Sequence, residues 1–243
     1  MTRERLEREQ VLAVVPAFNE DKSIGGVVDA VKSAGVAVVV VSDGSSDRTA
    51  AVARRHGARV LELPMNLGVG GALRTGFKFA INEGFEAVVQ IDADGQHPTH
   101  QIDTLIDVAN VSGADMVIGS RFLNDRPSMN VTGSRRFAMY ILARSASSSA
   151  AARITDSTSG FRLIRRPLLN EFSRHFATNY LGDTYEAVVS AGRAGYRIIE
   201  VPATLRDREF GESTASTGSA IRFTLKGLSV ALLGLHRKLA PRI

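Results

Sequence analysis

The chain has 243 residues, of which 44% are hydrophobic and 23% charged, so it can bury a sizeable core in one large domain or two small ones. The absence of cysteine excludes disulfides, thiolate catalysis and cysteine metal sites. Residues 1–10 lack the apolar segment of a secretory signal, and the longest apolar runs fall well short of the roughly 20 residues that span a membrane. We therefore expect a protein that is not integral to a membrane.

The two halves of the chain differ in charge. Residues 1–120 contain 11 Lys and Arg against 16 Asp and Glu, a net charge of −5, whereas residues 121–243 contain 19 against 9, a net charge of +10. A basic half of this kind favours binding to phosphate groups, to an anionic membrane surface or to nucleic acid. The sequence has no zinc-finger, helix-turn-helix or RNA-binding aromatic pattern, so we expect no nucleic acid.

Apolar runs alternate with amphipathic segments along the first half. Strands are predicted at 11–15, 36–41, 59–63, 87–91 and 115–119. Helices are predicted between them, the first starting after Ser23 and ending at Gly35 and the last running from about Thr99 to Val111. Strands that alternate with helices and carry unbroken apolar runs predict an α/β fold, with a mostly parallel sheet covered by helices on both faces.

Polar loops follow four of the predicted strands. They are PAFNE (16–20), SDGSSD (42–47), DADGQ (92–96) and SRFLND (120–125). In a doubly wound sheet, ligands bind in the crevice beyond the carboxyl ends of the strands. We therefore expect these four loops to converge on one edge of the sheet and to form the functional site there.

The second half is less periodic. The small-residue run at 145–152 is expected inside or beside a helix, and a strand is predicted at 197–205. Near the C-terminus, apolar residues recur at spacings of four and three from Ile221 to Leu239, with basic residues between them, which predicts an amphipathic basic helix. Such a helix can lie on a membrane surface, or it can form a coiled-coil dimer, and the pattern leaves both open.

Asp92 and Asp94 stand two residues apart at the end of a predicted buried strand. Two carboxylates at this spacing can cap the following turn, or they can share a hard cation such as Mg²⁺ or Mn²⁺, which takes oxygen ligands from protein, water and substrate phosphates. Gly95 would let the backbone approach a ligand closely. His97 is a possible further ligand, but a surface position before Pro98 is the expectation.

Seven segments in a fixed order carry a resemblance to a known family. They are VPAFNE, VSDGSSDRTA, NLGVGGALRTG, VQIDADGQHP, VIGSRF, TDSTSGFRLIRR and RIIEVPATLRDREFGES. Together they resemble the family 2 glycosyltransferases with the GT-A fold, and within these the dolichyl- and polyprenyl-phosphate sugar synthases of the dolichol-phosphate mannose synthase kind. The resemblance runs from about Val11 to Ser213 and favours a metal site at Asp92 and Asp94 over a simple turn.

The resemblance also implies a division of the chain. Residues 1–10 would be a charged N-terminal extension and residues 11–212 a GT-A glycosyltransferase domain. Within that domain, residues 11–120 would bind the nucleotide sugar and residues 121–212 the acceptor. Residues 213–243 would form the basic amphipathic helical tail.

Site residues follow from the resemblance position by position. The donor nucleotide would lie against the first two loops, and Ser42 stands where the family often has a further aspartate, so Asp43 would act alone there. Asp92 and Asp94 would bind the cation, and Arg74 is a candidate donor contact. The full donor set is Pro16, Ala17, Phe18, Glu20, Asp43, Arg74, Asp92, Ala93, Gln96 and Arg135.

Arginines of the later motifs would gather the donor diphosphate and the acceptor phosphate. The matching positions are Arg121, Arg135 and Arg208, with Arg136 as an alternative to Arg135. Arginine presents a planar fork of N–H donors that suits phosphate oxygens. The residues expected to act in catalysis are Asp94, Arg121, Arg208 and Glu186, the last with a lesser role.

The resulting expectation is a metal-dependent, inverting glycosyltransferase. It would move mannose or glucose from a nucleotide diphosphate to a polyprenyl or dolichyl phosphate, using Mg²⁺ or Mn²⁺, in cell-envelope glycan or glycoprotein synthesis. It would work at the cytoplasmic face as a peripheral protein, held by its tail or by a membrane partner, and could be a homodimer.

Three alternatives stay open from the sequence. A transferase acting on a saccharide hydroxyl would need a general base, for which Asp183 and Glu186 are the candidates. A sugar-nucleotide pyrophosphorylase would be expected to carry a Gly-rich basic loop after the first strand, which PAFNEDKS does not supply. A non-catalytic nucleotide-binding module would be expected to have lost one of the two aspartates, and both are present.

Overall fold

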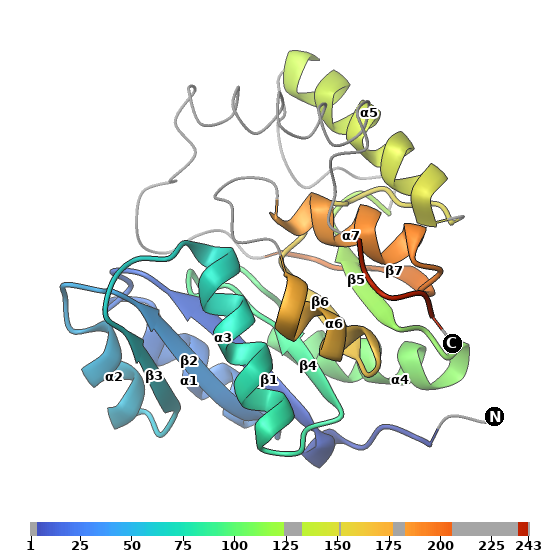
Figure 1. Cartoon of the computed structure of the whole chain (residues 1–243). Coiled ribbons are helices and arrows are strands. Elements are labelled where there is room, and N and C mark those ends of the chain that lie inside the picture. The colour runs from blue at the N-terminus through green and yellow to red at the C-terminus, as the bar shows by residue number, and fades with distance from the viewer. Residues whose placement is uncertain (1–3, 124–132, 151, 177–182, 206–237, 243) are drawn as a thin grey trace.

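The structure, a computed structural model, describes residues 4–123, 133–150, 152–176, 183–205 and 238–242. In the first of these ranges, strands and helices alternate as the apolar pattern predicted (Figure 1). They are β1 (Val11–Ala17), α1 (Ile24–Ser33), β2 (Ala37–Asp43), α2 (Thr49–Arg55), β3 (Arg59–Leu63), α3 (Val69–Asn82), β4 (Ala87–Gln90), α4 (Ile102–Ser112) and β5 (Met116–Ser120), with short 3₁₀ turns at Arg8–Gln10 and Thr99–Gln101.

The later ranges add two strands and three helices. They are α5 (Gly133–Ala150), β6 (Arg162–Arg165), α6 (Leu168–His175), α7 (Asp183–Arg193) and β7 (Ile198–Pro202). The sequence did not predict β6, because its apolar part is only two residues long, with Arg162 before it and Arg165 after it. Both arginines are nevertheless buried and donate to backbone carbonyls, Arg162 to Ser159 and Arg165 to Glu4. Hydrogen bonding of this kind is what allows a charged side chain inside a strand that pattern analysis scores as polar.

The central sheet has the strand order β3-β2-β1-β4-β6-β5-β7. Neighbouring strands pair in parallel, except that β6 runs antiparallel to both β4 and β5. The chain proceeds from β1 towards β2 on one side and returns to pair β4 on the other, so the strand order reverses at β1. Such a switch point opens a crevice at the carboxyl ends of the strands.

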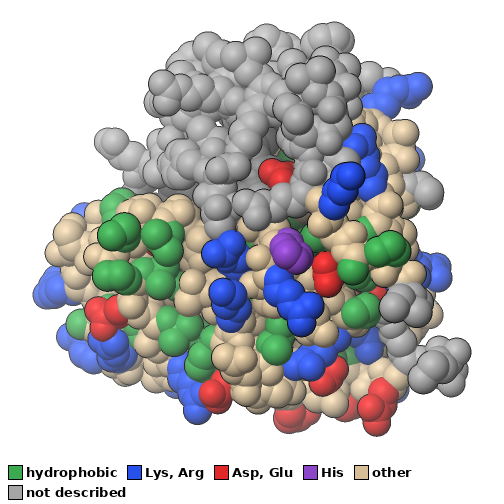
Figure 2. Space-filling model, viewed as in Figure 1, with side chains coloured by type: hydrophobic (Ala, Val, Ile, Leu, Met, Phe, Trp, Pro, Cys, Tyr) green, Lys and Arg blue, Asp and Glu red, His purple; other side chains and the backbone are tan. Residues whose placement is uncertain are grey.

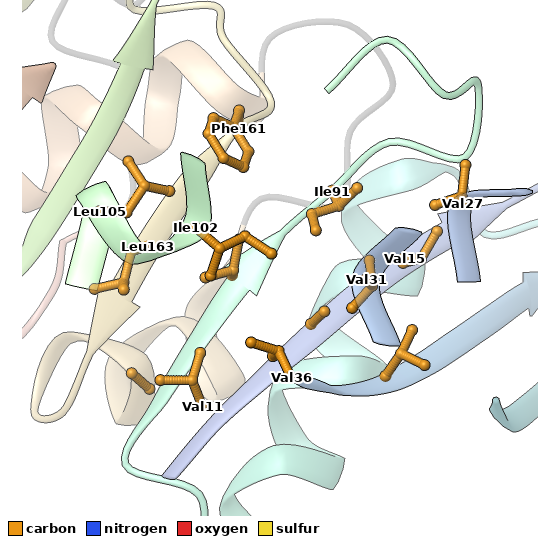
Figure 3. Packing of buried hydrophobic residues seen from close by; sticks show 14 of the residues in the cluster. Val11, Val15, Val27, Val31, Val36, Ile91, Ile102, Leu105, Phe161 and Leu163 are labelled. Carbon is orange, nitrogen blue, oxygen red and sulfur yellow. The ribbon is translucent and has the colours of Figure 1, made fainter. Parts of the chain in front are cut away.

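Helices cover both faces of the sheet, and a separate hydrophobic core lies between the sheet and the helices on each face. This arrangement confirms the predicted doubly wound α/β fold. One core packs alternate residues of the strands against α1, α2 and α4 (Figure 3). The other packs the remaining strand residues against α3, α5, α6 and α7. Because successive strand residues point to opposite faces, Val11 and Val15 lie in the first core and Leu12 and Val14 in the second. Unbroken valine runs are therefore buried on both sides.

The two ends of the described chain are fastened to this domain. Leu6 is 2% exposed, and its backbone N–H and C=O both bond the side chain of Asn110 on α4, at 2.8 and 2.9 Å. At the other end, Arg242 lies 3.0 Å from the fully buried carboxylate of Asp115, and Leu239 packs against the second core. Residues 238–242 are not helical. Most of the predicted amphipathic helix falls in 206–237, outside the described residues.

No helix within the described ranges has both the length and the hydropathy needed to cross a membrane.

The burial of Leu6 predicts that residues 4–10 contribute to stability, although the sequence indicated only a charged extension. Leu6→Ala should lower the free energy of unfolding by roughly 2–3 kcal/mol, because it leaves a cavity against α4. Val111→Ala, at a side chain that is 91% exposed, is the matched control and should change it by no more than about 0.5 kcal/mol. Urea unfolding of the three proteins measures both, and equal stabilities would contradict the packing of this segment.

Candidate functional site

The carboxyl edge of the sheet brings the four predicted polar loops together. β1, β2, β4 and β5 run in the same direction, so the loops that follow them emerge side by side. Because β6 runs the other way, the segment before it, 155–160, reaches the same edge. The predicted convergence is confirmed, and it has a fifth member that the sequence did not indicate.

The loops after β1 and β2 are joined by hydrogen bonds. Asn19, with a positive φ of 56°, accepts the N–H of Ser46 at 2.8 Å, and the N–H of Glu20 donates to the hydroxyl of Thr49 at 2.8 Å. Burial would raise the pKa of Asp47, but the bonds from Thr49 and from the N–H of Asp21 outweigh it and hold that pKa below its ordinary value. The two loops therefore form one fixed floor.

The predicted nucleotide residues lie on this floor. Pro16 and Ala17 are the last residues of β1, and the side chain of Phe18 just beyond them is 47% exposed. The carboxylate of Glu20 accepts a hydrogen bond from Ser23 at 2.7 Å, at the entrance to α1. An exposed ring beside a partly buried carboxylate is a suitable surface for a nucleoside.

Asp43 ties the end of β2 to the loop before α3. Its carboxylate is 3% exposed and accepts the N–H of Leu67 at 2.7 Å. Burial raises the pKa of Asp43, against a smaller lowering by the N–H groups of Leu67 and Gly68. Gly44 turns with φ of 68°, and a Cβ there would lie 2.6 Å from the backbone of Asn66. Asp43 thus has a structural bond, and contact with a base stays a prediction for it.

Asp92 sits between two groups that face its carboxylate. Its backbone N–H donates to Nδ1 of His97 at 2.9 Å, and Nε2 of the same ring lies 3.4 Å from its Oδ2. On the other side, a Cβ on Gly160 would come within 2.6 Å of that oxygen. The Asp92 side chain is 41% exposed, so the carboxylate still faces the crevice.

The expectation of a surface position for His97 is wrong. The residue is 6% exposed, because its ring packs against Phe161, with centroids 5.5 Å apart, and bonds the backbone of Asp92. A histidine followed by proline gives no sequence signal of such burial.

Asp94 performs the turn role that the sequence offered as an alternative. Its Oδ1 accepts the N–H of Gln96 at 3.1 Å, and Gly95 supplies the positive φ of 79° that the turn needs. Ala93 between the two aspartates is buried. Asp94 also lines a cavity of about 180 Å³ between this loop and α1, together with Lys22. A carboxylate has several lone pairs, so Asp94 can accept the hydrogen bond of the turn and still coordinate a cation.

Arg121 is held by Asp156, a residue for which the sequence predicted no role. The guanidinium pairs with the carboxylate in a fork, Nε to Oδ2 at 2.7 Å and Nη2 to Oδ1 at 2.8 Å, and Nη2 also donates to Thr158. Burial would raise the pKa of Asp156, but the bonds and charge of Arg121 outweigh it and lower that pKa. The charge of Asp92 also contributes to the raised pKa of Arg121, so the two residues share one electrostatic environment.

Two further residues fix the 155–160 segment. Glu200 on β7 accepts the N–H of Asp156 at 2.7 Å and the N–H and hydroxyl of Thr155, and burial raises its pKa. Arg162 is buried and donates to the carbonyls of Ser157, Ser159 and Thr184. The motif TDSTSGFR contained these residues, but bonds between positions 35 or 45 apart in the chain leave no local sequence signal.

The remaining predicted site residues either lie on helices α3 and α7 or have side chains that the structure does not describe. Glu186 is 6% exposed on α7 and lines a small cavity with Phe172, His175 and Leu239, beside α6. Arg74 is partly exposed on α3. Arg135 and Arg136 lie in α5 and Asp183 begins α7, where side chains fall outside the description, and Arg208 lies outside the described residues.

The donor set at Asp92 and Asp94 fits a hard divalent cation. Among the described residues, no group of three or more His, Asp or Glu forms a cage made of protein ligands alone. Mg²⁺ and Mn²⁺ sites for phosphate substrates do not need one, because one or two carboxylates combine with water and phosphate oxygens. The backbone of Gly160, with no Cβ, leaves room for the Asp92 carboxylate at this point.

The amino-acid sequence is similar to that of a known protein family and of individual curated proteins. Residues 12–173 match the family described as glycosyl transferase family 2. The chain is 31% identical over 244 residues to an undecaprenyl-phosphate mannosyltransferase of Micrococcus luteus, covering 95% of this chain and 99% of that one. It is 29% identical over 245 residues to a polyprenol monophosphomannose synthase of Mycolicibacterium smegmatis, covering 95% and 89%.

A solved structure shares the fold. It is a glucosyl-3-phosphoglycerate synthase from Mycobacterium tuberculosis in complex with Mn²⁺, UDP and glucosyl-3-phosphoglycerate, with a TM-score of 0.66 at 22% identity. The match covers 92% of this chain and 80% of that chain. At this identity the likeness establishes a common GT-A architecture.

Because Arg121 and Asp156 form a buried ion pair, we expect the removal of one of the two charges to lower the stability of the protein. Asp156→Asn keeps the shape but removes the carboxylate that pairs with the guanidinium, whose side chain is 20% exposed, and should lower the free energy of unfolding by about 3 kcal/mol at pH 7. Because the pKa of Asp156 is depressed, its contribution is present above the unfolded pKa of about 3.9 and is lost only as pH falls below it.

The difference in the free energy of unfolding between the native chain and Asp156→Asn, measured by urea unfolding, should therefore stay constant from pH 8 to pH 5. Asp103→Asn, in an exposed pair with Arg8, is the control and should change stability by less than about 1 kcal/mol. A difference that closes between pH 7 and pH 5 would contradict the depressed pKa.

Proposed function

Since the chain belongs to glycosyl transferase family 2, and is therefore a glycosyltransferase, we propose that it moves a hexose from a nucleotide diphosphate donor to the phosphate of a polyprenyl phosphate. The observation that carries the proposal is the meeting of Asp92, Asp94 and Arg121 at one edge of the sheet. Family membership also sets aside the sugar-nucleotide pyrophosphorylase and the non-catalytic module.

The donor would lie across the first two loops with its diphosphate towards Asp92 and Asp94. Phe18 offers an exposed ring to the base, and Glu20 offers carboxylate oxygens to ribose hydroxyls. A divalent cation, when bound, supplies Lewis-acid neutralisation of the diphosphate and of the leaving nucleoside diphosphate. A relative of the same fold holds Mn²⁺ with UDP, which supports Mn²⁺ or Mg²⁺ for this chain.

Arg121 would bring positive charge to the transferred group. Its Nε and Nη2 are engaged by Asp156 and Thr158, so the guanidinium cannot turn away, and its remaining edge presents N–H donors to phosphate oxygens. A guanidinium fixed in advance stabilises developing phosphate charge without reorganisation. Arg135 and Arg208 stay proposed partners in this role.

A phosphate acceptor explains the surroundings of Glu186. A phosphate monoester is already an anionic nucleophile and needs alignment and screening, whereas a sugar hydroxyl needs a base within hydrogen-bonding reach. Glu186 is buried beside α6 and lines a small cavity with His175 and Leu239, in a place suited to holding α7. Displacement by the phosphate oxygen in line with the leaving group would invert the anomeric carbon.

The proposed acceptor requires contact with a membrane surface. Over α3 and α6, Lys and Arg side chains gather around a histidine (Figure 2), and Lys78, Arg174 and His175 are exposed. We propose that the protein is peripheral at the cytoplasmic face, with this basic surface assisting the tail or a membrane partner. Dimerisation stays a further proposal.

The activity can be tested directly. GDP-mannose and UDP-glucose carrying a radiolabelled sugar, incubated with the protein, polyprenyl phosphate and Mn²⁺, should give a labelled product that extracts into organic solvent. Removal of the cation with EDTA should abolish it, and added Mn²⁺ should restore it. Asp92→Asn should lower kcat/KM at least roughly 100-fold, since it removes a charged ligand, while Asp103→Asn should not change it. No labelled lipid from any sugar nucleotide would contradict the proposed acceptor.

Glu186→Gln separates the two acceptor classes. With a phosphate acceptor, kcat should stay within about tenfold of the native value, because no proton is taken from the nucleophile. With a hydroxyl acceptor, the loss of the base should lower kcat by several decades while substrate binding is retained. Steady-state kinetics with polyprenyl phosphate decides between them, and thermal unfolding of the variant checks that α7 remains packed.

A further inference from the structure

We propose that His97 is a positioning residue that fixes the orientation of the Asp92 carboxylate through its Nε2–H. The inference rests on the proposed function, because it assumes that Asp92 meets a divalent cation. It concerns a side chain for which the sequence indicated a surface position without a role.

The hydrogen bond to the Asp92 backbone fixes the tautomer of the His97 ring. Nδ1 lies 2.9 Å from the backbone nitrogen of Asp92, which can only donate, so Nδ1 accepts and carries no proton. The proton of the neutral ring is then on Nε2. That nitrogen lies 3.4 Å from Oδ2 of the same aspartate. The imidazole of His97 therefore accepts a hydrogen bond from the Asp92 backbone, and its Nε2–H lies 3.4 Å from the Asp92 carboxylate, a contact longer than an ordinary hydrogen bond.

The ring of His97 cannot move away. The His97 side chain is 4% exposed, and it packs against the ring of Phe161, whose own exposure is 1%. Phe161 follows Gly160 in a segment fixed by the hydroxyl of Ser159, which donates to the carbonyl of Gly119 at 2.6 Å and accepts the N–H of Phe161. The histidine thus takes its position from the same 155–160 segment that holds Arg121.

Gly160 faces the Asp92 carboxylate from the side opposite to His97. A Cβ on Gly160 would lie 2.6 Å from Oδ2 and 2.8 Å from Oδ1 of Asp92, so the carboxylate occupies the space beside the glycine that a side chain would need. Between this backbone and the imidazole, the carboxylate has little freedom to rotate. A ligand whose orientation is fixed before the cation arrives binds it more tightly, and loss of such an outer partner commonly costs 10–100-fold in affinity.

Two isosteric substitutions separate the two contacts of the ring. Asn places an amide oxygen near the position of Nδ1 and can still accept the Asp92 N–H, but it has nothing at Nε2. Gln reaches the position of Nε2 and can donate to the carboxylate. We expect His97→Asn to weaken Mn²⁺ binding roughly 10–100-fold, and His97→Gln to retain it within a few-fold.

Mn²⁺ binding to the full chain is measured by the loss of the free-ion electron paramagnetic resonance signal, in the presence of saturating UDP or GDP. The Mn²⁺ concentration for half-maximal activity should rise in parallel in His97→Asn, with KM for polyprenyl phosphate unchanged. His56→Asn is the matched control, because His56 also faces a carboxylate, that of Asp29 at 2.8 Å, on the surface. It should bind Mn²⁺ as the native chain does.

The outcomes are distinct for this inference and for the function on which it rests. Native protein that binds no Mn²⁺ with either nucleotide would overturn both. Native binding with an unchanged, folded His97→Asn, or an equal loss in the Asn and Gln variants, would overturn the role of Nε2 alone. If the His97 variants unfold, Gly160→Ala disturbs the same carboxylate from the other side and should weaken Mn²⁺ binding to a similar degree. Unchanged binding in that folded variant would contradict a fixed Asp92.

Discussion

The antiparallel strand β6 is the constraint on which the site depends. Its direction turns the 155–160 segment towards the edge where the parallel strands deliver their loops. Arg162, buried within β6, fixes this segment by donating to the carbonyls of Ser157 and Ser159. Asp156 and Gly160 then take positions against Arg121 and Asp92. Without this reversal the parallel strands would supply carboxylates and an arginine, but Asp156 and Gly160 would not lie against Arg121 and Asp92.

Three charged residues at this edge, Arg121, Asp156 and Glu200, are joined by specific hydrogen bonds. Asp156 neutralises Arg121 in a buried fork, and Glu200 in turn accepts the N–H of Asp156. Such a chain of bonds is costly to desolvate but holds each member in one geometry. The Asp92 carboxylate is the more exposed member, at 41%. The buried groups therefore serve as supports, and the exposed Asp92 carboxylate is the one that faces the crevice, where we propose that it meets a cation.

The same arrangement supports a transfer reaction on phosphate. The proposed reaction brings two anionic partners close together, which calls for fixed positive charge and a cation site more than for a proton acceptor. A guanidinium fixed by Asp156 and a carboxylate fixed by His97 and Gly160 meet that need from two sides of one crevice. Glu186 is buried beside α6, where it lines a small cavity with Phe172, and its lesser role at the site stays a prediction.

The sequence by itself determined the mostly parallel sheet, the strands at 11–15 and 59–63, and the edge where Asp92 and Asp94 lie, because apolar periodicity and strand-end loops are local properties. It also carried the family resemblance through its ordered motifs. Only the tertiary structure decided what His97 and Asp156 do. One is buried by a phenylalanine 64 positions away, and the other pairs with an arginine 35 positions away, and contacts at that separation exist only after the chain has folded.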